Sequence, residues 1–355
     1  MNYSFKATLA GGLLAFGVLS GVSFAKEDAL PEINLQKSPW TVIALEKGFF
    51  KAEFDKVGTK KVTLIPQGAA ELLGAESAAV GGGALAIAQR MIYPATVHRS
   101  NGLDAVIVWL SEPSNRYRTP ILAAADNKKI NTIKDLDGQK FGSSRISCYW
   151  SAPFEALNKA GLPFTSRTNK NGRVRHENID NSAVAITAVL TGDTAATAVH
   201  LAAPAFTAPW LSGKFKIVAR PADDGVYVNH GGRVSYFAKR DFVNKYPSVV
   251  KAFLAAREQT REWTYDHVDE AAQIVAKETR VPLEVAKFQI THLGEWDFMG
   301  GEANADRARA SVKAFQKYYV ENGDDILTDK HLTDAQIDTF IDGRFFVGGS
   351  YSIYN

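Results

Sequence analysis

The stretch Gly142–Ser151 carries the residues best suited to chemistry with an anion. It reads Gly-Ser-Ser-Arg-Ile-Ser-Cys-Tyr-Trp-Ser, between a short β-rich run and a helical run. Backbone N–H groups at a helix start point outward, and the helix dipole adds partial positive charge there. Ser147, Cys148 and Tyr149 are therefore candidate ligand contacts, at a strand end where open α/β sheets place their ligands. The alternative is that Ser147 or Ser151 only caps the helix.

Cys148 is the only cysteine, so no intramolecular disulfide can form. A thiol at a helix start is a candidate nucleophile, because the helix dipole favours its thiolate. Catalysis would also need a base within reach, and no Cys–His pairing occurs near it in the sequence. The alternative role is that of a small apolar filler. Cys-x-x-Cys, His-x-x-x-His and His-Glu-x-x-His spacings are all missing, so we expect neither a dedicated metal site nor a cofactor.

A glycine run, Val80-Gly-Gly-Gly-Ala84, is a second candidate contact. We expect this run to follow a short strand and to precede a helix. In that position the bare backbone of Gly82 and Gly83 could approach a ligand closely. It is not a nucleotide-binding phosphate loop, because the Gly-x-x-x-x-Gly-Lys-Ser/Thr spacing is missing. A plain tight turn is the alternative.

Polar and cationic residues at predicted loops are further candidates. His200 follows a predicted strand, and His230 stands beside two glycines. Arg118 and Arg145 carry guanidinium groups that bind anions through paired hydrogen bonds. The alternative for each of these four residues is an ordinary solvated loop position.

Aromatic residues stand at or beside the same loops: Trp40, Tyr149, Trp150, Tyr227 and Tyr236. Aromatic walls suit an organic ligand or bracket a small one. Core packing is the alternative for these rings.

The elements that must position these residues alternate between strands and helices through the first two thirds of the chain. That order predicts a largely parallel sheet flanked by helices. The predicted strands are 62–66, 105–110, 121–125, 140–144, 195–199 and 215–219. The predicted helices are 69–76, 154–160, 183–190 and 204–211, and after about residue 240 only helices follow.

Two prolines indicate where helices begin. Pro153 fits only in a first turn, so its helix starts between Tyr149 and Ala152 and Ser147 lies in the loop just before it. Pro247 likewise opens a long helix, and residues 308–320 and 334–341 carry apolar residues at helical spacing.

Residues 1–25 have the pattern of a cleavable signal peptide. Lys6 is followed by an apolar run and then by Ser23-Phe24-Ala25, with small residues at the −3 and −1 positions of a cleavage site. The run is shorter than the roughly 20 apolar residues of a spanning helix. The whole chain has 41 basic and 38 acidic residues, a balance that argues against nucleic acid as the main partner.

A mature chain of about 330 residues exceeds what one core usually supports, so we expect two lobes. Polar or glycine-containing breaks at 126–130 and 229–233 indicate where the chain crosses between them. Residues 26–125 and 234–355 are therefore predicted to form lobe 1, and residues 126–233 to form lobe 2.

Four stretches carry a family resemblance: Ala44–Phe50, Ile133–Phe141, Thr191–Val199 continuing to Pro204-Ala205, and Ala238–Phe253. They resemble the taurine, aliphatic sulfonate and nitrate branch of the ABC-transporter periplasmic substrate-binding proteins. The last stretch is the most specific, with a basic residue, Asp-Phe, a polar spacer, Pro and then Val-Val-Lys-Ala-Phe. The resemblance implies the type 2 periplasmic binding protein fold, with two Rossmann-like α/β lobes joined by a hinge that the chain crosses twice.

The resemblance also implies where a ligand binds. It would be held between the lobes by the Trp40 loop, the turn at Gly82 and Gly83, the helix start at 147–149 and the strand end near His200. This chain departs from taurine binders at 233–235, which reads Arg-Val-Ser where an acidic residue is expected for the amine. His200 also replaces an expected aromatic residue. An anion without a positive group therefore fits better than taurine.

The implied function is that of a monomeric periplasmic solute-binding component of an ABC importer, which captures a small, sulfonate-like anion and delivers it to a membrane permease. The same fold also hosts enzymes such as aryl-sulfinate desulfinases and thiamine-pyrimidine synthases, so an enzyme using Cys148 is the alternative. The desulfinase cysteine belongs in the first loop, where this chain has Ser38-Pro39-Trp40, and the cysteine-rich motif of the synthases is missing. A periplasmic sensor domain is a third hypothesis.

Overall fold

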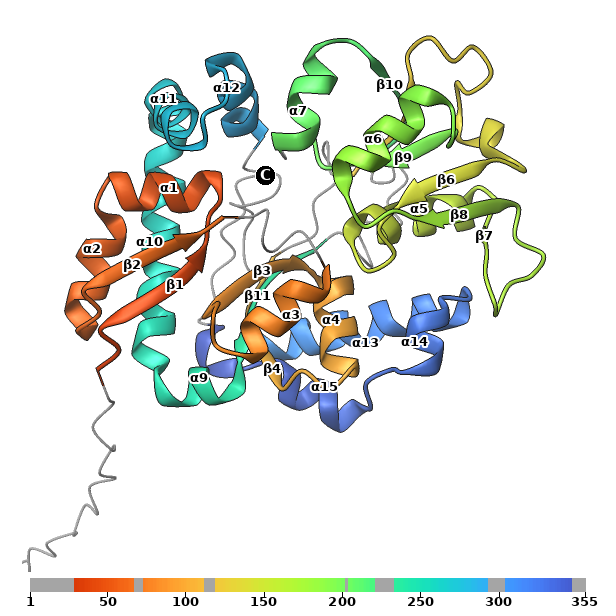
Figure 1. Cartoon of the computed structure of the whole chain (residues 1–355). Coiled ribbons are helices and arrows are strands. Elements are labelled where there is room, and N and C mark those ends of the chain that lie inside the picture. Colours follow the sequence, from red (N-terminus) through yellow and green to blue (C-terminus); the bar gives the residue numbers. More distant parts are fainter. Residues whose placement is uncertain are drawn as a thin grey trace, which may run out of the picture.

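Two β-sheets lie side by side with helices around them in the computed structural model of this chain (Figure 1). The structure describes residues 29–66, 73–111, 119–201, 204–220, 233–292 and 304–346. The predicted signal peptide lies outside these residues.

The first sheet has the strand order β2-β1-β3-β11-β4. Strand β1 pairs in parallel with β2 and β3, while β11 runs antiparallel between β3 and β4. The strands are β1 (Glu32–Gln36), β2 (Lys61–Ile65), β3 (Ile87–Met91), β4 (Ala105–Leu110) and β11 (Val234–Lys239). Strand β11 belongs to the last third of the chain, so the chain returns to this sheet after building the second one.

The second sheet has the strand order β10-β5-β9-β6-β8-β7. Strands β9, β6, β8 and β7 are parallel, and β5 is antiparallel to both β9 and β10. The strands are β5 (Ile121–Ala124), β6 (Lys140–Ser143), β7 (Phe164–Thr165), β8 (Val174–Asn178), β9 (Ala196–Ala198) and β10 (Phe215–Ala219). The predicted lobe boundary at residue 125 assigned β5 to lobe 1, but its hydrogen bonds place it in the second sheet.

The described helices fall into an early set that alternates with strands and a late set that does not. The early set is α1 (Pro39–Glu46), α2 (Phe49–Phe54), α3 (Leu73–Gly81), α4 (Ile92–Ser100), α5 (Cys148–Lys159), α6 (Ser182–Thr191) and α7 (Pro204–Leu211). The late set is α9 (Arg240–Lys245), α10 (Pro247–Asp266), α11 (Val268–Thr279), α12 (Leu283–His292), α13 (Ala305–Glu321), α14 (Asp325–Asp329) and α15 (Asp334–Phe340). The predicted change to helices alone after about residue 240 is confirmed for the described residues.

Local sequence explains several of these helix starts. Ser38 caps α1 in a capping box with Thr41, and Pro39 occupies the first turn, where a missing N–H costs nothing. Pro247 opens α10 in the same way, as predicted. Strand β4 is an unbroken apolar run, Ala-Val-Ile-Val-Trp-Leu, because both of its faces are covered.

The largest apolar cluster is shared by the two sheets. It contains Ile107 and Phe237 of the first sheet, Phe141 of the second, and Phe315 and Tyr319 of α13. A second cluster fills the side of the first sheet toward α1, α2 and α10, and a third lies among β5, α6 and α7. Helix α13 therefore packs into a core to which both sheets contribute.

The glycine run connects different elements from those predicted. It ends helix α3 and precedes strand β3, whereas we expected a strand before the glycines and a helix after them. The residues after the run, Ile-Ala-Gln-Arg-Met, form a five-residue strand with four buried positions. Strand β3 was missed because glutamine and arginine interrupt its apolar pattern.

Candidate functional site

Helix α5 begins at Cys148, one residue before the range that the proline argument predicted, and Pro153 lies inside the helix beyond its first turn. Ser147 is the N-cap residue and lies in the loop just before the helix, as predicted. The Ser147 hydroxyl accepts a hydrogen bond from the Tyr149 N–H at 3.1 Å and donates one to the Ser144 carbonyl at 2.7 Å. Ser147 therefore performs the capping role weighed as its alternative, and it fixes the direction in which the helix start points.

This helix start packs against the end of the first sheet. Cys148 and Ala152 form an apolar cluster with Met91, the last residue of β3, and Val234, the first residue of β11. Cys148 is only 8% exposed. The carboxyl ends of β3 and of β6, which leads into α5, therefore meet at one place.

The loop between β1 and α1 reaches the same strand. The Trp40 indole Nε1 donates to the Gln89 side-chain Oε1 at 3.4 Å, and the Gln89 N–H donates to Gln36 Oε1 at 3.4 Å. Side chains two residues apart on a strand lie on one face, roughly 7 Å from each other along it. Gln89 and Met91 thus connect the Trp40 loop with Cys148.

Tyr149 and His200 belong to the same neighbourhood on the side of the second sheet. The Tyr149 ring packs edge-on against Phe206, with centroids 5.6 Å apart. Tyr149 also packs against a cluster that contains Val199 and Leu201, the neighbours of His200. His200 is buried at the carboxyl end of β9, which runs parallel to β6.

Gly82 and Gly83 lie away from this neighbourhood. Gly83 has a φ of +78°, a left-handed conformation that favours glycine, at the C-terminal end of α3. Both glycines precede the amino end of β3, and Met91 is at the other end of that strand. The structure thus shows the tight-turn alternative and does not bring the glycines to the Cys148 cluster.

Trp40 and Tyr236 are brought together, but as core residues. Each is 1% exposed, and their ring centroids are 6.2 Å apart in a cluster with Phe253. The Tyr236 hydroxyl accepts a hydrogen bond from Arg257 Nε at 3.3 Å. The void beside the two rings is about 10 Å³, space for about one water molecule at most. The rings of Trp40 and Tyr236 are therefore packed in the core, which was the alternative to a role as ligand walls.

Arg145 is not a solvated loop residue. Its guanidinium Nη1 donates to Asp324 Oδ2 at 3.1 Å and to the Tyr93 hydroxyl at 3.0 Å. Burial alone would lower the Arg145 pKa, but Tyr93 and Asp324 outweigh that effect and raise it. The predicted contacts Arg118 and His230, and the aromatic candidate Tyr227, lie outside the described residues.

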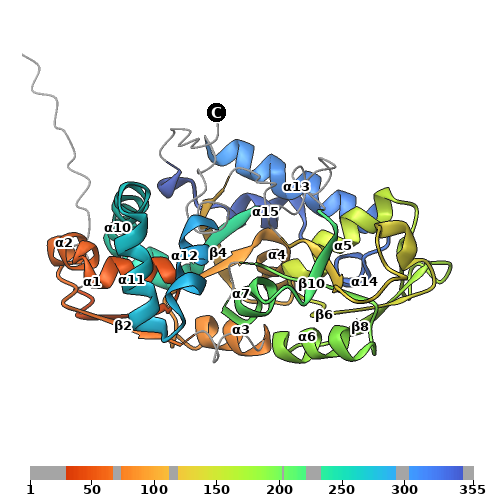
Figure 2. The same cartoon turned by 90° about the horizontal axis from the view of Figure 1, so that it is seen from above.

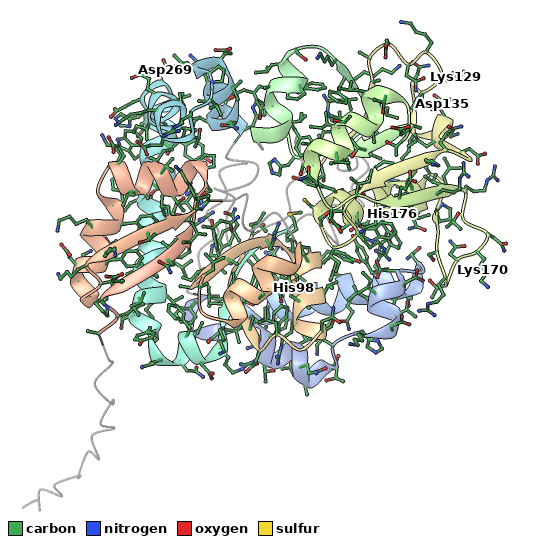
Figure 3. The ribbon with its side chains drawn as sticks, viewed as in Figure 1. His98, Lys129, Asp135, Lys170, His176 and Asp269 are labelled. Atoms are coloured by element: carbon green, nitrogen blue, oxygen red, sulfur yellow. The ribbon has the colours of Figure 1, made fainter. Side chains whose placement is uncertain are left out.

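Two histidines, the buried His98 and the half-buried His176, have strongly lowered pKa values. Burial, together with the nearby Arg90, lowers the pKa of His98 to about 4. Burial and the nearby Arg145 lower the pKa of His176 to about 3. Figure 3 labels both side chains, His98 on α4 and His176 on strand β8 of the second sheet. Both imidazoles are therefore neutral near pH 7.

A pocket of about 570 Å³ opens beside the β1–α1 loop. It is lined by Lys37, Ser38 and Pro39, by the C-terminal end of α11 with its cap residue (277–280), and by Gln289 of α12. Its volume is in the range of small-molecule sites. Lys37 Nζ donates to the Glu278 carbonyl at 2.8 Å. Gln289 is fully buried, and neither atom of its amide makes a hydrogen bond to a described residue.

Several residues of this region were missed from the sequence. Gln89 and Met91 were missed with strand β3, and Gln289 is one polar residue in an otherwise ordinary helix. Arg233, noted only as a departure from taurine binders, is buried and donates from Nη1 to the Ser111 carbonyl at 3.0 Å. A signal for β3 was available, because Ala84–Met91 is apolar until its last residues and is followed by a proline-containing helix.

The described residues contain no group of three or more His, Cys, Asp or Glu side chains arranged to hold a metal ion. None of the helices they form is both long enough and apolar enough to cross a membrane.

Comparisons with known proteins were made for sequence and structure. Residues 39–271 match the model of the NMT1/THI5-like family. No curated protein matches the chain by sequence.

Solved structures match over most of the chain. The alkanesulfonate-binding protein SsuA from Xanthomonas axonopodis pv. citri, bound to MOPS, aligns with a TM-score of 0.71 and 16% identity, covering 90% of this chain and 99% of that one. The periplasmic aliphatic sulphonate binding protein SsuA from Escherichia coli aligns with a TM-score of 0.64 and 19% identity, covering 84% and 96%. A mutant of DSZB in complex with biphenyl-2-sulfinic acid aligns with a TM-score of 0.56 and 14% identity, covering 89% and 98%.

These matches confirm the predicted fold, because proteins of the periplasmic binding fold align along nearly their whole length. The chain passes from the first sheet to the second between β4 and β5 and returns between β10 and β11, which are the two crossings expected of that fold. The family model covers well over half of the chain. The protein therefore belongs to the NMT1/THI5-like family and has the type 2 periplasmic binding protein fold, in agreement with the resemblance to sulfonate, nitrate and taurine substrate-binding proteins.

Proposed function

We propose that this protein is the solute-binding component of an ABC importer and that it captures a small, sulfonate-like anion between its two α/β lobes. One observation carries the proposal: the first turn of α5 packs onto the carboxyl end of β3, so strand ends from both sheets converge there. Ligands of open α/β sheets bind at such ends, and a helix start favours an anion. The names of the aligned SsuA proteins support a sulfonate.

The proposed contacts are those that converge on this place: Ser147, Cys148, Tyr149 and His200. Arg233 precedes Val234 of the Cys148 cluster and adds a buried positive charge nearby. Arg118 and His230 remain proposed contacts on the crossing segments. The rings of Trp40 and Tyr236 support the β1–α1 loop from the core.

We propose no catalytic role. The alternative, an enzyme that uses Cys148, draws support from the DSZB complex with a sulfinic acid. Against it, the Cys148 side chain packs among Met91, Ala152 and Val234, which are apolar. Apolar burial disfavours the thiolate that nucleophilic catalysis requires.

The proposed partner is a membrane permease, and the proposed location is the periplasm after removal of residues 1–25. The proposed working form is a monomer whose lobes close on the ligand by a hinge motion. A periplasmic sensor would share the pocket. If the ligand-loaded protein bound a receptor and not a permease, the protein would be identified as a sensor.

A thermal-shift screen tests the proposal. The panel contains 1-propanesulfonate, taurine, nitrate, benzoate and sodium chloride as an ionic-strength control. A ligand at 100 times its dissociation constant adds about 2.7 kcal/mol to native stability. We expect the sulfonate to raise the melting temperature and chloride to leave it unchanged. If no anion shifts the melting temperature, the capture proposal is wrong.

A Cys148→Ser variant separates binding from catalysis. We expect it to retain the thermal shift, because a binding protein needs the serine-sized side chain and not the thiol. If the wild type turned over an aryl sulfinate and Cys148→Ser did not, the protein would instead be established as an enzyme.

A further inference from the structure

One buried carboxylate collects hydrogen bonds from three directions. Asp324 is 0% exposed. Its Oδ2 accepts from the Tyr93 hydroxyl at 2.8 Å, from the Trp150 indole Nε1 at 2.9 Å and from Arg145 Nη1 at 3.1 Å. Its Oδ1 accepts from the Leu327 N–H at 2.9 Å, which caps α14.

These donors come from separate parts of the chain. Tyr93 lies on α4, next to the first sheet, while Arg145 and Trp150 flank the start of α5 beside the second sheet. Asp324 stands at the turn between α13 and α14. Figure 1 shows α13 and α14 below α5 and β8, and in the view from above in Figure 2 α14 lies underneath α5.

The turn that carries Asp324 is itself tied to the second sheet. The Gly323 carbonyl accepts from the Thr168 hydroxyl at 2.8 Å and from the Ser166 hydroxyl at 3.2 Å. Asp325 accepts from the Thr168 N–H at 2.9 Å. Because Thr168 and Ser166 belong to the β7–β8 connection, the carboxylate is held from a direction different from that of α5.

Arg145 is fixed along its whole length. Its backbone N–H donates to Asn178 Oδ1 at 2.8 Å, and its guanidinium carbon lies 3.5 Å from the centre of the Trp150 ring. Cation–π contact and a charge-assisted hydrogen bond to Asp324 therefore act on the same side chain. Without Asp324, the buried guanidinium would lose its only carboxylate partner among the described residues.

We propose that Asp324 is a positioning residue for the anion-binding first turn of α5. The proposal rests on the proposed function for its effect on ligand affinity. Arg145 stands two residues before Ser147, and Trp150 follows Tyr149 directly, so Asp324 holds both ends of the segment 147–149. Since the carboxylate is fully buried, it acts on this segment through Arg145 and Trp150 and does not touch a ligand.

The accessibility of Cys148 tests this without any ligand. Cys148 is the only thiol and the first residue of α5, so its reaction rate with DTNB reports local opening of the helix start. A buried hydrogen bond to a charged group contributes about 1.5–3 kcal/mol, so Asp324→Asn should raise the labelling rate about tenfold or more. An unchanged rate would overturn the proposal.

Asp325→Asn is the matched control. It changes the neighbouring carboxylate, which is hydrogen-bonded to Thr168 and not to Arg145 or Trp150. We expect its Cys148 labelling to match the wild type when rates are compared at equal free energy of unfolding in urea. Equal acceleration by both variants would mean that only general loosening of the turn is measured, and it would overturn the assignment to Asp324.

Trp150→Phe keeps the proposal testable if Asp324→Asn does not fold. It removes one donor to Asp324 Oδ2 and leaves the ring stacked under Arg145, and it should also raise Cys148 labelling. The affinity for 1-propanesulfonate separates the two proposals. Faster labelling of Cys148 with no anion binding by any variant would leave the positioning role standing and remove the capture function. Equal Cys148 labelling and equal affinity for 1-propanesulfonate in wild type and Asp324→Asn would remove the positioning role and leave the capture function standing.

Discussion

At the scale of single residues, Trp40 is surrounded by side chains from three other elements, β3, α2 and α10. The proline argument predicted Ser147 in the loop before α5 correctly, but it misplaced Pro153, which lies inside the helix and not in its first turn. The aromatic candidates show where such reasoning stops. Trp40 is buried because Gln89, Phe50 and Phe253 pack around it, and Gln89 and Phe253 are far away in the sequence. A ring at a ligand wall and a ring in a core have the same residue type, and only distant neighbours distinguish them.

The lowered pKa of His98 predicts a loss of stability in acid. The unfolded side chain has a pKa of about 6.5 and the folded one about 4, so below pH 6.5 the unfolded state binds more protons. Stability is therefore full above pH 6.5 and falls as the pH drops toward 4, by about 2 kcal/mol at pH 4.5.

Urea unfolding of wild type and His98→Leu at pH 7.5 and 4.5 checks this. The variant should lose less stability between the two pH values, by about 2 kcal/mol. His331→Leu, at an exposed histidine, is the control for the effect of replacing a histidine by leucine. An identical pH dependence in wild type and His98→Leu would contradict the account, and His176 would then have to carry the effect.

Gln289 and Gln316 form a matched pair of buried amides on helices. Within the described part of the chain the Gln289 amide makes no hydrogen bond, whereas the Gln316 amide accepts from the Leu332 N–H and donates to the Leu332 carbonyl, both at 2.7 Å. Leaving a buried polar group unsatisfied costs about 1–3 kcal/mol. Gln289→Leu should therefore raise the free energy of unfolding by about 1 kcal/mol, and Gln316→Leu should lower it. Destabilisation by both substitutions, measured in urea, would show that Gln289 has a partner in solution.

At the scale of elements, apolar runs bounded by turns were predicted well. Strands β4 and β10 and helix α7 have the predicted bounds, and each is a short, mostly apolar segment followed by a polar residue or a turn. Strands β1, β3, β7, β8 and β11 were missed. Strand β8 reads Val-Arg-His-Glu-Asn and is mostly polar, so it is held by backbone pairing with β6 and β7 and not by burial. A strand held by backbone pairing need not show a local pattern of apolar and polar residues from which it could be predicted.

Ser147 and Ser151 provide a test of the α5 start, since either was a candidate cap. Ser147 accepts the Tyr149 N–H, whereas the buried Ser151 hydroxyl has no hydrogen-bond partner. Ser147→Ala should cost about 1 kcal/mol of stability and Ser151→Ala close to none, measured by urea unfolding. The reverse order of the two values would mean that the helix begins elsewhere.

At the scale of the whole molecule, the two-sheet division was predictable and the shared core was not. Chain length and alternation of elements predicted two lobes. The packing of α13 against both sheets depends on contacts such as Phe154 with Tyr319, whose stacked rings are 4.9 Å apart and 165 positions apart in sequence. The boundary near residue 125 was misjudged for a related reason, because strand partners decide the sheet to which β5 belongs.

The shared core predicts cooperative unfolding of both sheets. Phe154→Ala should lower the free energy of unfolding by about 3 kcal/mol while near- and far-ultraviolet circular dichroism transitions stay coincident. Two separate transitions in the wild type would mean that the sheets unfold independently and that α13 does not join them.

Protection of Cys148 by an anion tests the central claim most directly, because the thiol sits at the helix start assigned to capture. The DTNB labelling rate should fall as 1-propanesulfonate is added, reach a plateau, and remain unchanged with equal concentrations of sodium chloride. A rate that does not respond to the sulfonate, while the sulfonate raises the melting temperature, would place the ligand elsewhere and contradict the account.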